Sequence, residues 1–360
     1  MALEDIISAL VTLFDAVGEG LVALALGFSS APTGIGFLVG AILVVAFKSV
    51  VPVSFEVESL TVVSRQGNRD WRTMCYIVLL AGIIGAVLGG LGLFGKIVNF
   101  IEGPILAGMM TGVGVILTFV AIDTCKDSKV IGIVSVVVAL VTFLLLGNNE
   151  NNLIYALVVS IVASVIVSRF VTFTPLISEY EKSSIKLIPL DGFFSFIRRP
   201  AVIRGVLALL AFRTGTSIAY SGIDAQLAGQ AVNVDHTNII AGVAGVASSL
   251  FGGAPVEPII SVTAAAPNPH YSGALMMVIV GILLLFGFLP RLAKFVPMAS
   301  IAGFLFLLGA VIAIPENVGG LISETDALSG PVTLVVTAAT VDPFLGMVCG
   351  ILVRFLAGVV

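Results

Sequence analysis

Six ionisable side chains lie within otherwise apolar stretches of this 360-residue chain: Asp15, Glu19, Glu56, Glu58, Arg213 and Glu257. An isolated charge in apolar surroundings is costly, so we expect these groups to pair with one another or to line water. Ionisable groups at such positions commonly mark binding sites and proton pathways. We therefore take them as the first candidates for chemistry.

Asp15 and Glu19 are four residues apart, so a helix would place both carboxylates on one face. Arg213 is the cationic member of the set. It could form an ion pair with Asp15 or Glu19, which would only stabilise the fold. Alternatively, its planar guanidinium could face a cavity and bind a carboxylate, a sulfate or a purine carbonyl. The sequence favours neither alternative.

Glu56 and Glu58 are two residues apart, which places them on the same side of an extended strand. Because like charges repel, one of the two should hold a proton more readily than it would in water. With Asp15 and Glu19 they form the predicted proton-coupling set, unless one simply reaches the membrane surface. Glu257 could contact an N–H group of a solute, carry the coupled proton, or cap backbone N–H groups.

Ser59 and Ser261 are predicted N-caps of short helices, and the N–H groups beside them could bind a solute. Tyr220 could stack on a planar ring, although packing explains an aromatic residue equally well. The predicted substrate-binding set is thus Ser59, Arg213, Tyr220, Glu257 and Ser261.

We predict no catalytic residue, metal site or cofactor, because the chain shows no His/Cys/Asp group at suitable spacing.

The composition indicates that these residues sit in a lipid bilayer. Apolar residues make up 58% of the chain and charged residues 11%, with a mean hydropathy of +1.17. Soluble domains carry roughly a quarter charged residues. No basic cluster suggests a nucleic-acid partner. We expect a multi-pass protein of the plasma or inner membrane, with the lipid bilayer and a small solute as its partners.

Fourteen apolar segments can be counted, seven on each side of a polar stretch at 172–199. Those before it are 6–28, 33–47, 52–65, 73–94, 102–122, 129–147 and 153–170. Those after it are 200–222, 237–251, 255–266, 273–290, 297–314, 328–340 and 342–359. The predicted organisation is a first repeat (1–171), a cytoplasmic linker (172–199) and a second repeat (200–360).

The two halves share an order of motifs. Pro52-Val53 opens segment 3 and Pro255-Val256 opens segment 10, followed by Ser59-Leu60-Thr61 and Ser261-Val262-Thr263. Gly82 in segment 4 matches Gly281 in segment 11. The next segments are glycine-rich, with Gly108, Gly112 and Gly114 in one and Gly303 and Gly309 in the other. Since seven is odd, the second copy must insert upside down, which is typical of secondary transporters.

Segments 3 and 10 are too short and too polar for plain spans. Each reads as a proline, an extended piece and a short helix, which in a membrane is tolerated only when paired or lining a wet cavity. Two half-helix N-termini facing each other would offer N–H groups to carbonyls or anions. The predicted fold is an all-α polytopic membrane protein of 14 segments in a 7+7 inverted repeat.

Lysine and arginine placement predicts the orientation. Thirteen basic residues fall on the face of the linker, including Arg65, Arg72, Lys126 and Lys129. The positive-inside rule then places the linker in the cytoplasm and both termini outside.

Pro52–Ala121 and Ala241–Val318 resemble the nucleobase/ascorbate (xanthine/uracil) permeases, nearest the hypoxanthine/guanine branch. The shared elements are Pro52-Val53, Gly82 leading to Pro104-Ile-Leu-Ala-Gly, Gly252-Gly253-Ala254-Pro255, and Pro290 leading to Phe295-Val296-Pro297. The resemblance implies the fold of the SulP anion transporters and bicarbonate exchangers, with cytoplasmic termini. It also implies a homodimer and H⁺- or Na⁺-coupled uptake. A core (segments 1–4 and 8–11) would move against a gate (segments 5–7 and 12–14).

The leading functional prediction is a proton-coupled permease for a purine, uracil or a similar heterocycle. The alternative is a SulP-like transporter of sulfate or carboxylates, which Arg213 and the two helix N-termini favour. A membrane-embedded enzyme or a scaffold is the third hypothesis, and we predict that the protein is not an enzyme.

Overall fold

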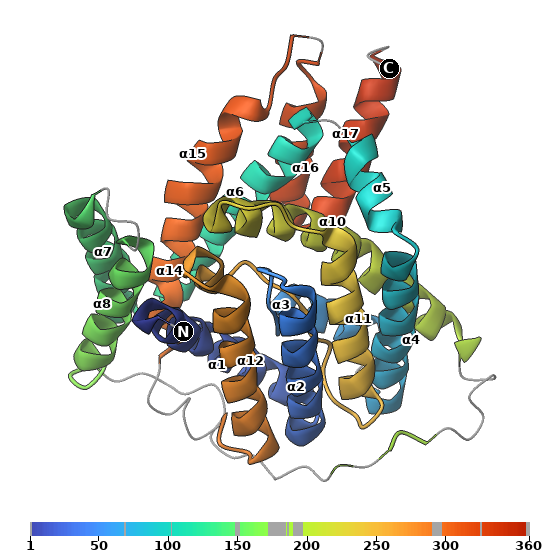
Figure 1. Ribbon diagram of the computed structural model, residues 1–360, viewed down its shortest axis with the longest axis horizontal. Helices are drawn as coiled ribbons and strands as arrows, with labels where there is room; N and C mark the ends of the chain where they lie inside the picture. Colours follow the sequence, from blue (N-terminus) through green and yellow to red (C-terminus); the bar gives the residue numbers. More distant parts are fainter. Residues whose placement is uncertain are drawn as a thin grey trace.

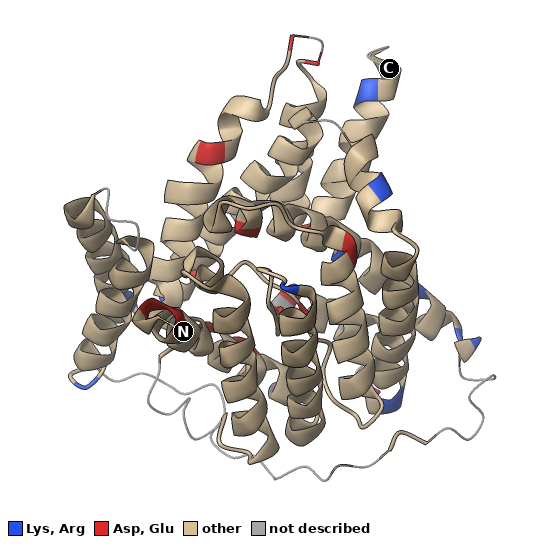
Figure 2. Cartoon of the chain, in the orientation of Figure 1, with Lys and Arg blue, Asp and Glu red and all other residues tan. Residues whose placement is uncertain are grey.

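The computed structural model describes residues 2–67, 70–101, 103–147, 152–171, 185, 187–189, 197–289, 297–324 and 326–357. Seven described helices are long and apolar enough to cross a membrane, and four shorter apolar helices accompany them. Figure 2 shows charged side chains at helix ends and a few in the middle of the molecule. The chain is a multi-pass membrane protein, as predicted.

All seven segments of the first repeat are present. They are α1 (Leu3–Ala25), α2 (Ser30–Phe47), β1 (Val53–Ser54) with α3 (Val57–Gln66), α4 (Trp71–Gly90), α5 (Leu93–Phe100) with α6 (Gly103–Asp127), α7 (Lys129–Leu146) and α8 (Asn152–Val167). The linker 172–199 lies mostly outside the described residues.

The second repeat follows the same order. Its segments 8 to 11 are α10 (Pro200–Ala228), α11 (Val234–Ser249), β2 (Glu257–Pro258) with η1 (Val262–Ala265), and α12 (Pro269–Leu285). Segment 12 comprises η2 (Met298–Ile301), α14 (Ala302–Phe306), the π-helix η3 (Leu307–Ala313) and α15 (Ile314–Asn317), followed by η4 (Val318–Gly320). Segments 13 and 14 are α16 (Ser329–Thr340) and α17 (Pro343–Leu356).

Close glycine contacts relate the halves to each other. Segment 4 crosses segment 9, where a Cβ on Gly82 would lie 2.7 Å from the carbonyl oxygen of Gly242. The equivalent crossing joins segments 2 and 11, where a Cβ on Gly34 would lie 2.6 Å from the carbonyl oxygen of Gly281. Side chains would hold these helices apart, so the glycines permit the packing. Gly82 and Gly281 therefore have equivalent packing roles in the two repeats, because each permits a close helix crossing.

Two further contacts join equivalent segments directly. β1 and β2 form an antiparallel pair, with Val53 opposite Pro258 and Ser54 opposite Glu257. Segments 5 and 12 meet at Gly114 and Gly309, where a Cβ on Gly309 would lie 2.5 Å from the carbonyl oxygen of Gly114. The 7+7 inverted repeat with broken segments 3 and 10 is confirmed.

The buried apolar side chains form two clusters. The first comes from α1–α4, α10–α12 and the connections between them, including β1 and the stretch around β2. The second comes from α5–α8, segment 12 and α17, and it also includes residues of α1, α10, α11 and the stretch around η1. In Figure 1, α2, α4, α11 and α12 lie side by side below α10, while α6, α16 and α17 rise above it.

The predicted membrane orientation stays a prediction. It depends partly on Arg69, Lys182, Lys186, Arg291 and Lys294, and these lie outside the described residues.

Candidate solute-binding site

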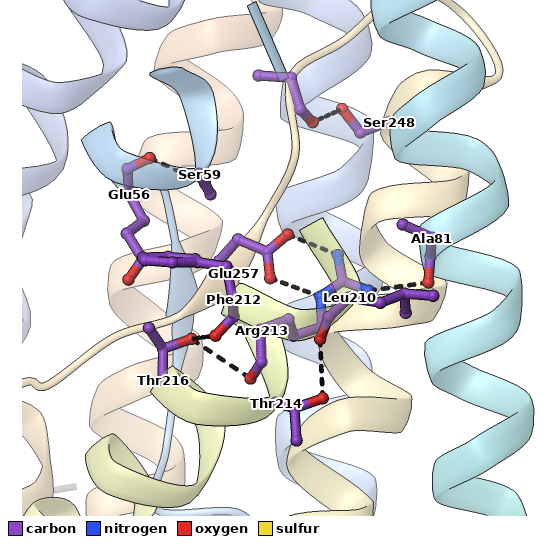
Figure 3. A network of polar contacts seen from close by, with 11 residues as sticks. Glu56, Ser59, Ala81, Leu210, Phe212, Arg213, Thr214, Thr216, Ser248 and Glu257 are labelled. Carbon is purple, nitrogen blue, oxygen red and sulfur yellow. Dashed lines mark hydrogen bonds and ion pairs between the residues drawn. The ribbon is translucent and has the colours of Figure 1, made fainter. Parts of the chain in front are cut away.

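A fully buried ion pair connects three segments at the centre of the first cluster (Figure 3). Arg213 on α10 donates from Nε to Oε2 of Glu257 at 2.6 Å and from Nη2 to Oε1 at 2.5 Å. Its Nη1 donates to the carbonyl oxygen of Ala81 on α4 at 3.2 Å. Both charged side chains are 0% exposed. Such a bidentate contact fixes the guanidinium in one orientation.

Arg213 forms an ion pair, which was one of its two predicted roles, but its partner is not one of the two carboxylates considered. Asp15 and Glu19 were the candidates, whereas the carboxylate comes from Glu257 at the start of β2. The pairing of β2 with β1 brings Glu257 into the middle of the bundle. Glu257 therefore caps no helix, and the pair satisfies Arg213 internally.

In segment 10 the predicted N-cap is confirmed, but the element that follows the cap differs from the predicted short helix. Ser261 is the N-cap of η1, and its Oγ accepts the N–H of Thr263 at 3.1 Å. The element that follows is only a four-residue 3₁₀-helix. The N–H of Ser261 donates to Oδ1 of Asp224 at 3.0 Å, so a carboxylate of the protein already occupies this helix end.

In segment 3 the predicted N-cap is shifted. α3 begins at Val57, so Ser59 lies within its first turn, and its hydroxyl donates to the carbonyl oxygen of Glu56 at 2.9 Å. The extended part is limited to Val53–Ser54. Glu56 and Glu58 therefore flank a helix start and do not share a strand as predicted.

A pocket of about 130 Å³ lies where the two clusters meet. The polar residues that line it are Asp15, Glu19, Glu56, Glu58, Thr124 and Tyr220. Its apolar wall comes from α6, from Ile259 and Ile260 before η1, and from segment 12. The pocket thus lies between segments 1, 3, 8 and 10 on one side and segments 5 and 12 on the other.

All four residues of the predicted proton-coupling set line this pocket. Asp15 and Glu19 share a face of α1, as their spacing predicted. Of the predicted substrate-binding set, Tyr220 lines the pocket, whereas Ser59, Arg213, Glu257 and Ser261 do not. Those four lie in the supporting structure around the broken segments.

Hydroxyl groups attach α1 to the second repeat. The hydroxyls of Ser8 and Ser272 lie 2.7 Å apart, and those of Thr12 and Ser261 lie 3.1 Å apart. These contacts fix the helix that carries Asp15 and Glu19 against segments 10 and 11.

Two functional candidates were missed from the sequence. Asp224 is 0% exposed and holds the start of η1. Asp235 on α11 accepts the N–H groups of Phe94 and Gly95, which attaches the N-terminus of α5 to the start of α11. The signal for Asp224 was an acidic residue in an apolar helix, but segment 8 was predicted to end at 222.

Comparisons with known proteins find one matching family model and several solved structures of the same fold. A family model described as the Sulfate permease family matches residues 6–129, a stretch that includes all four pocket carboxylates. A search of curated protein sequences finds no match.

Two solved structures share the fold. One is the transmembrane domain of a cyanobacterial bicarbonate transporter, BicA, with 19% identity and a TM-score of 0.55, covering 94% of this chain and 96% of that one. The other is the murine Slc26a9 anion transporter in its inward-facing state, with 15% identity and a TM-score of 0.59, covering 99% of this chain and 69% of that one.

These findings overturn the resemblance to the nucleobase/ascorbate permeases, and with it the nucleobase as solute. The physical reason lies in the motifs that carried it. Gly82 serves a helix crossing, and Pro52 and Pro255 open the broken segments. The architecture requires such residues whatever solute the protein carries. They do not identify the solute.

Proposed function

We propose that this protein is a secondary transporter for a small anion. The pocket at the boundary of the two hydrophobic clusters carries this proposal, because it is formed around two broken segments inside the bundle. The match to the Sulfate permease model and the fold shared with a bicarbonate transporter and an anion transporter support it. Binding near the middle of the bilayer, at the interface of inverted repeats, is the usual arrangement in such transporters.

We further propose that transport moves a core of segments 1–4 and 8–11 against a gate of segments 5–7 and 12–14. The division of the buried side chains supports this, since the first cluster contains no residue of segments 5–7 or 12–14, and only the second contains residues of both bodies. Solute in the pocket would contact both bodies. Relative movement could then expose the pocket to one face of the membrane at a time.

Coupling to protons is the finer part of the proposal. Asp15, Glu19, Glu56 and Glu58 converge on a small pocket, and four uncompensated negative charges there would be costly. Protons that travel with the anion would neutralise these carboxylates. The inward proton gradient would then drive uptake.

Uptake by purified protein in liposomes tests the proposal. We expect radiolabelled bicarbonate or nitrate to accumulate when a proton gradient is applied. Val120→Trp should lower the rate by about tenfold or more, because the indole would fill the pocket that Val120 lines. Val137→Trp is the matched control, since Val137 is exposed on α7 away from the pocket. Absence of uptake of any anion, or equal effects of both variants, would refute the proposal.

A further inference from the structure

The charges in the pocket are of one sign. Asp15 and Glu19 on α1 and Glu56 and Glu58 at the start of α3 all line it. None of the described residues that line the pocket is a lysine or an arginine. An anion bound in the pocket would therefore contact carboxylates and none of the lysines or arginines among the described residues.

The positively charged and N–H groups close to the pocket already have hydrogen-bond partners within the protein. Arg213 donates three hydrogen bonds, two to Glu257 and one to Ala81, and is 0% exposed. The N–H of Ser261 is taken by Asp224. A doubly charged anion would therefore gain little from these groups.

Glu56 is a buried carboxylate in the pocket whose hydrogen-bonding capacity is not fully satisfied by the protein. Glu56 is only 4% exposed, and among the described residues no hydrogen bond of normal length reaches its carboxylate oxygens, although the hydroxyl of Tyr220 lies close enough to interact with them. A buried polar group without a partner is expensive and rare in folded proteins. Glu56 lines the pocket, so a proton or a hydrogen-bond donor of the solute could complete what the Tyr220 hydroxyl supplies only in part.

We infer that the pocket selects anions by charge, accepting monovalent anions and excluding divalent ones such as sulfate. This inference rests on the proposed anion transport and specifies its solute class. Each added negative charge on a solute is repelled by every ionised carboxylate of the pocket. When a monoanion enters together with one proton, the net charge of the pocket does not change. When sulfate enters with one proton, the pocket becomes more negative by one charge. Glu56 is the principal specificity-determining residue, because it is the most deeply buried of the four carboxylates in the pocket.

Methanesulfonate and sulfate provide a matched pair of probes, because both are tetrahedral sulfur oxyanions that differ in charge. In liposomes at neutral pH we expect methanesulfonate uptake to exceed sulfate uptake by about tenfold or more, which corresponds to about 1.4 kcal/mol. Glu56→Gln should narrow this ratio, since it removes a charge but keeps the size of the side chain. Glu316→Gln should leave the ratio unchanged, because Glu316 is exposed on α15 and does not line the pocket.

The outcomes distinguish a failure of charge selection from a failure of the proposed anion transport. Sulfate uptake as fast as methanesulfonate uptake, or an unchanged ratio in Glu56→Gln, would overturn charge selection while leaving anion transport standing. Uptake of neither probe, nor of bicarbonate or nitrate, would overturn both.

Discussion

At residue 213 a guanidinium is held entirely inside the protein by one carboxylate and one carbonyl group. A buried pair of this kind is costly to break, since removal of one partner leaves the other as an unpaired charge. Its net contribution to stability is smaller, because both charges lost their hydration when the protein folded. Arg213 and Glu257 therefore fix the position of β2 and need not bind solute themselves.

Single and double substitutions test this reading. Glu257→Leu alone should destabilise the protein by about 3–5 kcal/mol, since it leaves the Arg213 charge buried without a counterion. The double variant Arg213→Met with Glu257→Leu should recover most of that loss. Thermal unfolding in detergent measures both. If the double variant were as unstable as the sum of its single variants, Arg213 and Glu257 would not act as a pair.

Local spacing predicted some of these residues and long-range contacts decided the others. Asp15 and Glu19 followed from a four-residue helical spacing, and the cap at Ser261 followed from its neighbours. The Arg213–Glu257 contact joins residues 44 apart and depends on strand pairing, which no local pattern specifies. Asp224 was missed because α10 continues to Ala228 and ends only at Gly229, which has a φ of 61°.

At the scale of elements, glycine positions decide how closely helices approach. In α4, Gly82 faces the backbone of α11, whereas a Cβ on Gly90 would meet nothing within 4 Å. The repeated order of prolines and glycines predicted that the halves match and where the broken segments lie. It did not predict that η1 is only a four-residue 3₁₀-helix, nor that Asp224, which is 37 residues away, accepts the N–H of its N-cap Ser261.

Two glycine substitutions in the same helix should have opposite effects. Gly82→Ala should destabilise the protein by about 1–3 kcal/mol, because its methyl group would clash with the carbonyl oxygen of Gly242. Gly90→Ala should be neutral or stabilise the protein by up to about 1 kcal/mol, since alanine is the better helix former. Thermal unfolding of the two variants side by side measures the difference. Equal effects would contradict the close crossing of α4 and α11.

At the scale of the whole molecule, the pocket lies where two hydrophobic clusters meet. Hydropathy and an odd number of segments per repeat predicted the inverted architecture. The solute class could not be predicted in the same way, because the motifs that repeat serve packing. The side chains that line the pocket come from six segments, and their charges add up only once the chain is folded.

The most direct test of the account is the distance between core and gate in the presence and absence of solute. Spin labels would be placed at Ile42→Cys on α2 and Val137→Cys on α7, both exposed, in a background without Cys75, Cys125 and Cys349. A second pair within the core, Ile42→Cys and Val87→Cys, serves as the reference. In liposomes, bicarbonate or nitrate should shift the core–gate distance distribution and leave the core–core distribution unchanged. A core–gate distribution that neither anion shifts, or equal shifts in both pairs, would contradict transport by movement of two bodies around the pocket.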